Sequence, residues 1–304
     1  MSGLGSYPAA QEASRPLKSN QRRAHIYRFR AESVYVQKRN ARDQDMSSLT
    51  FSFATLSDAT VVQRLLLNCG LPNEDVHQHL DHFIVAKDGD QLAGVIGLQL
   101  LGRTGLLRSL AVDSRYRNQG LGKALYAKLV GYAHLRGIAK LYLLTLTTQE
   151  YFSKLGFEKV DRADVPPEIG TTAEFRDLCP STAVCLAKDI QNEARYFPKE
   201  VLRLRPDVPG ARMWGVALQK TMLTYFEVDP QSRFERHSHE SEQITMVLKG
   251  ELYFEIDERV VRVNEGEVIA IPSNLPHAVF TKELSVEAVD AWSPLMGKYD
   301  EDLG

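Results

Sequence analysis

Three histidines in the last third of the chain have the spacing of a metal site. His237 and His239 are two residues apart, Gln243 follows four residues later, and His277 comes from a later part of the sequence. Alternate residues of a strand face the same side, so His237 and His239 can both point into a barrel that His277 completes. Imidazoles with an amide oxygen suit iron, nickel, manganese, copper or zinc without selecting one of them. The alternative is a barrel without metal in which these histidines only pack.

A glycine-containing segment in the first half has the composition of a phosphate-binding loop. Gly120 and Gly122 lie between a predicted strand and a predicted helix, with Arg117 before them and Lys123 after them. Glycines let a backbone turn tightly and approach a ligand, and the free amides at a helix N-terminus favour the negative charge of a pyrophosphate. Taken alone, the same glycines also suit a tight turn into a surface helix.

The elements around this loop predict an α/β domain. Hydrophobic periodicity indicates helices and strands, with a hairpin turn at 88–90. We expect helices at 57–67, 120–134 and 149–155, and strands at 49–54, 83–86, 93–100, 106–112 and 141–146. The glycine loop therefore connects a buried strand to an amphipathic helix.

Two motifs in this half resemble those of the GNAT family of N-acetyltransferases. They are Arg117-x-x-Gly120-x-Gly122, which follows a strand ending in Leu-Ala-Val-Asp, and Tyr-Phe-Ser-Lys-Leu-Gly-Phe from Tyr151 onward. The resemblance covers about residues 49–188 and implies a mixed sheet with flanking helices and acetyl-CoA as the co-substrate. It further implies that Leu110 and Val112 pair with the pantetheine arm and that the Leu110 amide polarises the thioester carbonyl. The amides that would hold the pyrophosphate belong to Arg117, Asn118, Gln119, Gly120, Leu121, Gly122 and Lys123.

One position departs from the pattern of the family. A tyrosine shortly before Leu-Gly-Phe often protonates the leaving thiolate in GNAT enzymes, but the residue four positions before Gly156 is Phe152. Tyr151 is one residue early and would point elsewhere on a helix. Either Tyr151 is displaced into this catalytic role or water protonates the thiolate; a general acid contributes roughly 10²- to 10⁴-fold.

A narrower resemblance is to the arsenic-resistance N-acetyltransferases. It rests on Leu-Arg-Ser-Leu-Ala-Val at 107–112, on Leu-Tyr-Leu-Leu-Thr at 141–145, and on Pro-Pro-Glu-Ile-x-x-Thr-x-Glu-Phe at 166–175, which is followed by Leu-Cys-Pro-x-x-Ala-Val at 178–184. That family is associated with acetylating the α-amino group of glutamate-like amino acids such as arsinothricin and phosphinothricin. Anionic substrates need cationic clamps, and Arg103 and Arg108 are the candidates because guanidinium binds such groups in a bidentate manner. The alternative for each arginine is an exposed or structural role.

The last third of the chain predicts a β-sandwich or barrel. Short strands separated by turns are expected at 221–228, 243–248, 251–256, 260–263, 268–271 and 278–280. Residues 195–295 resemble both motifs of the cupin family, the first containing the histidine pair and Gln243 and the second ending at His277. The resemblance implies a jelly-roll barrel that binds a divalent transition metal. Gln243 stands where many cupins have glutamate, and Asn274 where many have glycine.

Length and composition agree with a two-domain protein. A chain of 304 residues exceeds what one hydrophobic core usually organises. We divide it into a flexible basic arm at 1–48, a GNAT domain at 49–188 and a cupin domain at 189–304. Residues 1–46 hold nine basic and four acidic residues, although the whole chain has a net charge of -2. Met46 is an alternative start, which would make the arm foreign to the protein.

The remaining composition bears on location. No segment approaches the roughly 20 apolar residues that a membrane span requires. The spacing of the three cysteines suits neither a disulfide framework nor a zinc ribbon, which favours a cytoplasmic protein.

Two functional hypotheses follow. The first is an acetyl-CoA-dependent enzyme that acetylates a small, glutamate-like amino acid, with no nucleic-acid or membrane partner and, by analogy with both families, a homodimeric assembly. The second is a regulatory protein that binds acyl-CoA and whose metal-dependent cupin acts as an isomerase, a lyase or a ligand sensor. The intact glycine loop favours the enzyme, whereas Phe152 favours the second hypothesis.

Overall fold

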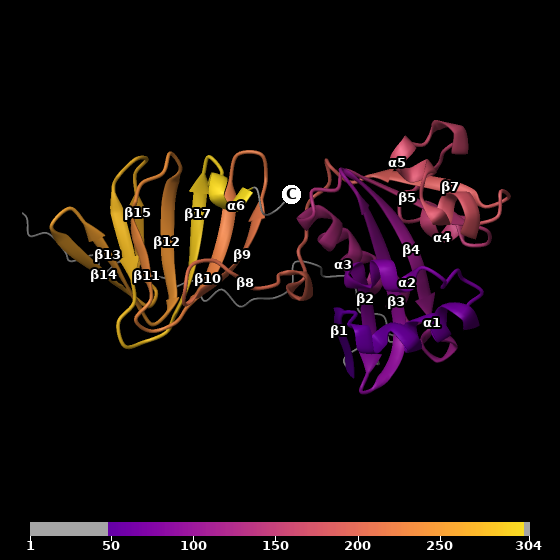
Figure 1. Cartoon of the computed structure of the whole chain (residues 1–304), viewed down its shortest axis with the longest axis horizontal. Helices are drawn as coiled ribbons and strands as arrows, with labels where there is room; N and C mark the ends of the chain where they lie inside the picture. Colours follow the sequence, from indigo (N-terminus) through magenta and orange to yellow (C-terminus); the bar gives the residue numbers. More distant parts are fainter. Residues whose placement is uncertain (1–47, 301–304) are drawn as a thin grey trace, which may run out of the picture. The chain divides into compact units, whose positions relative to one another are not determined.

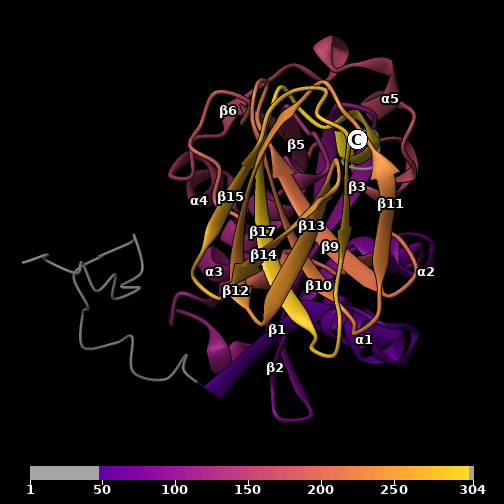
Figure 2. The same cartoon turned by 90° about the vertical axis from the view of Figure 1, so that its left-hand side faces the viewer.

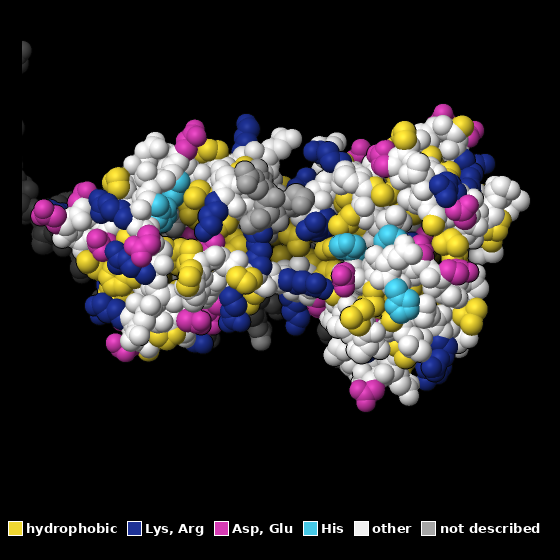
Figure 3. Space-filling view, in the orientation of Figure 1, with side chains coloured by type: hydrophobic (Ala, Val, Ile, Leu, Met, Phe, Trp, Pro, Cys, Tyr) yellow, Lys and Arg dark blue, Asp and Glu magenta, His cyan; other side chains and the backbone are white. Residues whose placement is uncertain are grey.

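The computed structural model of the chain describes residues 48–300, so the arm expected at 1–48 lies outside the described residues except for its last position. The described residues form a seven-stranded sheet with helices, followed by two sheets without long helices (Figure 1). Basic and acidic side chains are mixed over the face drawn in Figure 3. No helix in the part of the chain described has the length and apolar character needed to cross a membrane.

The first domain is built on a mixed sheet. Its strand order is β1-β2-β3-β4-β5-β7-β6, and every neighbouring pair is antiparallel except β4 and β5, which are parallel. This is the mixed sheet expected from the sequence. The strands are β1 (Leu49–Phe53), β2 (Phe83–Asp88), β3 (Gln91–Leu101), β4 (Thr104–Val112), β5 (Lys140–Thr145), β6 (Glu158–Lys159) and β7 (Val184–Asp189).

Helices cover both faces of this sheet (Figure 1). Alternate residues of β2 show why: Ile84 belongs to the core beneath α3 (Leu121–Leu135), whereas Val85 packs against α1 (Ala59–Asn68) and α2 (Val76–His79). The connections after β5 carry α4 (Gln149–Ser153), α5 (Pro167–Gly170) and a π-helical turn at Glu174–Leu178. Each face of the sheet therefore has its own hydrophobic core.

The two parallel strands separate along their length. β4 and β5 are paired only from Thr104 to Leu106 and from Lys140 to Tyr142. Beyond that point β4 contains a bulge, where Ser109 has a φ of 57°, while β5 stays paired with β7 along its whole length. We call the opening between 107–112 of β4 and 143–145 of β5 the β4–β5 wedge. It ends at the glycine loop, which joins β4 to α3.

The second domain consists of two facing antiparallel sheets (Figure 2). Inward residues such as Phe226, Val247, Phe254 and Trp292 form one core between them. The sheets confirm the expected all-β fold of the cupin type. The six-stranded sheet contains β15 (Val268–Ile271), β12 (Glu242–Lys249), β17 (Val286–Ser293), β10 (Met222–Val228), β9 (Ala211–Ala217) and β8 (Arg205–Pro206), and the four-stranded sheet contains β11 (Arg233–His237), β16 (His277–Phe280), β13 (Glu251–Ile256) and β14 (Arg259–Asn264).

The segment after β7 packs on the first domain. Ile190 and Val201 are almost fully buried in the core that α3 shares with the sheet. Gly131 of α3 lies so close to this segment that an added Cβ would be 2.5 Å from Cδ of Pro198. The core of the first domain thus includes residues beyond 188, where the sequence pattern placed the boundary.

Candidate functional site

The glycine loop begins where β4 ends. Asp113 accepts a hydrogen bond from the amide of Arg115 and so caps a 3-10 turn, after which Asn118 and Gly120 have φ values of 61° and 89°. These left-handed residues turn the chain into α3, whose first-turn amides have no acceptor within the helix. Arg117 donates to the carbonyl oxygen of Val112 at 2.9 Å, which fixes the loop against the strand. Such a turn into free helix N-terminal amides is a geometry that suits anions.

Tyr151 faces this loop from α4. A Cβ built on Gly122 would lie 3.2 Å from the Tyr151 hydroxyl oxygen. That hydroxyl is buried and has no hydrogen-bond partner among the described residues, and burial raises the pKa of Tyr151. Phe152 instead packs edge-on against Phe157 in the core. The tyrosine that the sequence placed one residue early thus approaches the loop, whereas the expected direction was elsewhere on the helix.

The two candidate arginine clamps do not lie together. Arg103 is exposed in the turn before β4, roughly 20 Å from Leu110 at the rise of a strand. Arg108 is fully buried, and its guanidinium donates two hydrogen bonds to the Asp75 carboxylate and lies 3.0 Å from Glu174. Neither arginine therefore presents a free guanidinium at the wedge. Sequence reasoning did not find Asp75, because no motif contains it. Glu174 lies within the motif at 166–175, but the sequence assigned it no role.

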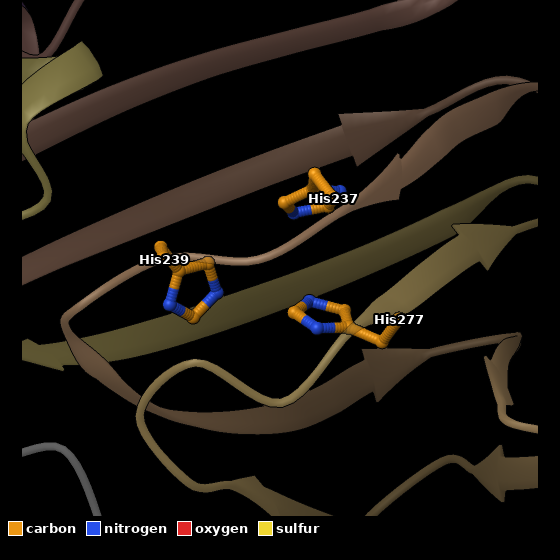
Figure 4. A group of neighbouring side chains, drawn as sticks. All are labelled: His237, His239 and His277. Atoms are coloured by element: carbon orange, nitrogen blue, oxygen red, sulfur yellow. The ribbon is translucent and has the colours of Figure 1, made fainter.

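Three histidines converge inside the second domain (Figure 4). Their ligand atoms lie within 4.8 Å of one another, with His237 at the end of β11, His239 in the loop after it and His277 at the start of β16. The sequence pattern expected both members of the first pair on one strand, but the strand ends at His237. In each ring Nδ1 donates to a main-chain carbonyl two residues away, at 2.6, 2.6 and 2.8 Å. With the proton on Nδ1, each Nε2 is unprotonated and its lone pair can bind a metal.

The surroundings of Gln243 test whether a metal would fit. Its amide nitrogen donates to Thr245 and to Asp290, so its oxygen points to Nε2 of His239 at 3.2 Å. Two acceptors face each other there, and Nε2 of His277 is buried without a partner among the described residues. Burial lowers the pKa of His277, which favours the neutral ligand form. These donors fit a divalent cation.

Two further features support this reading of the second site. Glu242 points outward and Gln243 inward, as the alternation of the strand predicted. Asn274, which stands where many cupins have glycine, has a φ of 61°, a region that asparagine tolerates better than most residues. The cavity beside the histidines is lined by Phe226, Asp290, Trp292 and Tyr299 among others, and burial raises the pKa of Asp290 to about 7.

The described residues thus form an α/β domain with a glycine loop before α3 and a β-barrel domain in which three histidines converge. Residues 48–157 match the model of the Acetyltransferase (GNAT) family, and residues 224–290 match that of the Cupin domain. The chain therefore contains an acetyl-CoA-dependent N-acetyltransferase domain of the GNAT type and a cupin domain.

Individual relatives resemble the first domain. An "Uncharacterized N-acetyltransferase" of Chlorobaculum tepidum is 25% identical over 150 residues, which are 48% of this chain and 89% of the relative. An amino-acid acetyltransferase of Neisseria meningitidis is 25% identical over 138 residues, which are 45% of this chain and 30% of that enzyme. The structure of N-acetylglutamate synthase from Neisseria gonorrhoeae with coenzyme A and N-acetyl-glutamate is 21% identical, with a TM-score of 0.42, and the match covers 46% of this chain and 35% of the synthase.

Proposed function

We propose that this protein transfers the acetyl group of acetyl-CoA to the α-amino group of a small, glutamate-like amino acid, such as arsinothricin or phosphinothricin. The observation that carries the proposal is the β4–β5 wedge, which opens toward a glycine loop and has a buried arginine beside it. The amino-acid acetyltransferases among the relatives support an amino acid as the acceptor. The cytoplasmic location and the homodimer expected from the sequence stay predictions.

Each group has a part in this reaction. Backbone amides of residues 117–123 hold the pyrophosphate, and Leu110 and Val112 line the pantetheine. The Leu110 amide donates to the carbonyl oxygen on which negative charge develops when the amine attacks. Tyr151 gives its proton to the leaving thiolate, since its hydroxyl has no other partner among the described residues. Arg108 binds the α-carboxylate of the acceptor. A carboxylate of the protein that is paired with Arg108 must first move away from the guanidinium.

Release of free thiol from acetyl-CoA tests the transfer. We would assay phosphinothricin, arsinothricin, glutamate and a panel of primary amines with Gly120→Asp and with the matched variant Gly102→Asp. Both glycines have positive φ and open space for a Cβ, but only Gly120 lies at the pyrophosphate loop. We expect turnover of glutamate-like acceptors that Gly120→Asp abolishes and Gly102→Asp retains. Binding of acetyl-CoA without thiol release from any amine would remove the transferase assignment.

The cupin site supports a second candidate activity. The paired acceptors of His239 and Gln243 and the bare nitrogen of His277 favour a metal-dependent isomerase, lyase or ligand sensor in this domain. A divalent metal held by His237, His239, Gln243 and His277 would supply Lewis-acid polarisation of a bound oxygen.

Metal analysis of the purified protein tests this second candidate. We expect close to one divalent transition metal per chain in the natural protein and at least a tenfold loss in His277→Ala. The matched variant His77→Ala removes an exposed histidine of the first domain and should retain the metal. Equal metal contents in all three proteins would contradict a metal site and would indicate that these histidines only pack in the barrel.

A further inference from the structure

A buried cluster of opposite charges lies beside the wedge. We call it the acid–arginine cluster; it consists of Asp75, Arg108 and Glu174, each no more than 7% exposed. Asp75 is the N-cap of α2, Arg108 belongs to β4, and Glu174 begins the π-helical turn before β7. Three segments far apart in the sequence therefore meet on the face of the sheet opposite α3.

The packing around Glu174 places this cluster at the closed end of the wedge, where the pairing of β4 and β5 stops. Phe175, the next residue, packs with Leu106 and Tyr142, which are the last paired residues of β4 and β5. Arg108 is two residues further along β4 and directly precedes the bulge at Ser109. Glu174 thus approaches the opening from the face that α3 and the glycine loop leave free.

The two carboxylates are not equivalent. Asp75 accepts two hydrogen bonds from Arg108, whereas the Nε of Arg108 lies 3.0 Å from Oε2 of Glu174 without a hydrogen-bond alignment. Oε2 has no other donor within the described part of the chain, and Oε1 meets only the Cys179 thiol at 3.9 Å. Glu174 therefore keeps an acceptor site for an incoming N–H group.

The charges around Glu174 favour a cationic ligand. Two carboxylates and one guanidinium give a formal charge of -1 when both acids are ionised. His79 lies 3.8 Å from Asp75, and Arg162 stacks on Phe175 from the outer side. Burial raises the pKa of Glu174 to about 7, opposed by Arg108 and assisted by Asp75. A carboxyl group with this titration can exchange a proton near neutral pH.

We propose that Oε2 of Glu174 accepts the proton of the acceptor's ammonium group near the closed end of the wedge. This inference rests on the proposed N-acetyltransferase function and specifies its acceptor as a zwitterionic α-amino acid. The ammonium group donates to Glu174 while the α-carboxylate takes the place of Glu174 at Nε of Arg108. The binding of the zwitterion thus exchanges one ion pair for two.

The transfer then balances. One ammonium proton passes to Glu174, and the amine lone pair forms the C–N bond with the thioester carbonyl. The C–S bond breaks, the thiolate leaves with its electron pair and takes a proton from Tyr151, and the new amide nitrogen returns a proton to Tyr151. Glu174 finally releases its proton to solvent, so an ammonium and acetyl-CoA yield an amide, free thiol and one proton.

Glu174→Gln tests the proposal, with Glu168→Gln as the matched control because Glu168 is exposed in the same connection. We would measure kcat/KM against pH with the best acceptor, and the binding of CoA by calorimetry. We expect Glu174→Gln to lower kcat/KM by roughly 10²-fold or more and to remove its rise through about pH 7, with unchanged CoA affinity. A natural rate and pH profile in Glu174→Gln would overturn the proposal.

A binding measurement separates this inference from the proposed function. L-Glutamate and glutarate, which lacks the ammonium group, are titrated into the CoA-saturated protein. Tighter binding of glutamate, lost in Glu174→Gln and kept in Glu168→Gln, supports an ammonium site at Glu174 even when no thiol is released. Equal binding of the two ligands, or no binding of either, rejects it. If the glutamine variant does not fold, Glu174→Asp serves as a second variant, because it keeps the charge but moves the carboxylate back by one methylene. An unchanged preference for glutamate over glutarate in Glu174→Asp also rejects the assignment.

Discussion

Tyr151 combines a buried hydroxyl with a position at the glycine loop. Because this hydroxyl has no partner among the described residues, Tyr151→Phe should leave the free energy of unfolding unchanged or raise it by about 1 kcal/mol. Turnover should fall by roughly 10²-fold, since the thiolate then depends on water for its proton. Urea unfolding and thiol-release kinetics measure the two effects. Tyr116→Phe, which removes the hydrogen bond from a half-buried tyrosine to Asp88, is the control for the loss of a phenol. Natural turnover in Tyr151→Phe would exclude a role as proton donor.

Glu174 also makes a prediction about stability. Its pKa rises from 4.5 to about 7 on folding, so its contribution to stability is fully present below about pH 4.5 and is lost as the pH rises through 7. The difference is on the order of 3 kcal/mol at most. Glu174→Gln should therefore gain stability relative to the natural protein between pH 4.5 and 8, as followed by urea unfolding. A constant difference across this range would contradict the buried titration, and Glu168→Gln provides the reference.

Some of these site residues could be predicted from the sequence and others could not. Gly120 and His277 belong to local motifs whose chemistry follows from spacing, so both could be found from the sequence alone. Glu174 is 66 residues from Arg108, and nothing in the sequence indicates that folding brings them together. Arg108 was expected as a free clamp because a single sequence does not show which carboxylates accompany a buried guanidinium.

At the scale of elements, α3 both presents the glycine loop and anchors the segment after β7. Gly131→Ala would gain about 1 kcal/mol of helix propensity, but its Cβ would lie 2.5 Å from Pro198 and 2.7 Å from the Tyr196 carbonyl oxygen. We expect a net loss of about 1–3 kcal/mol in urea unfolding. Gly170→Ala, where the Cβ meets only an ordinary contact at 3.8 Å, should be neutral or stabilising. An equal change in the free energy of unfolding of the two variants would show that Pro198 and the Tyr196 carbonyl move away from the added Cβ at little cost.

Regular alternation made many strands predictable, and its failure explains two of those that were missed. β10 and β12 alternate between buried and exposed residues and were located within a few positions. β17 was missed: it buries Asp290 and turns Val289 toward the outer face, which inverts the usual pattern. β9 was also missed, and it contains Gly215, a residue that weakens a strand pattern.

At the scale of the whole molecule, the first domain should depend on the segment that follows its last strand. Fragments 48–188 and 48–203 differ by this segment, in which Ile190 and Val201 are buried. Each such side chain stabilises by about 1.5–3 kcal/mol, so the shorter fragment should unfold at a clearly lower urea concentration. Circular dichroism during urea titration measures this. Equal midpoints would place the domain boundary near 188, as the sequence pattern suggested.

The β4–β5 wedge leaves a row of strand amides and carbonyls without a neighbouring strand. If a pantetheine arm binds in that opening, as we propose, its amides supply the missing hydrogen-bond partners, and the co-substrate completes the sheet. A ligand that binds only the folded state raises the free energy of unfolding by about 2.7 kcal/mol when its free concentration exceeds its dissociation constant 100-fold. We therefore expect acetyl-CoA to slow the proteolysis of the folded protein, because cleavage requires an opening that the bound co-substrate disfavours.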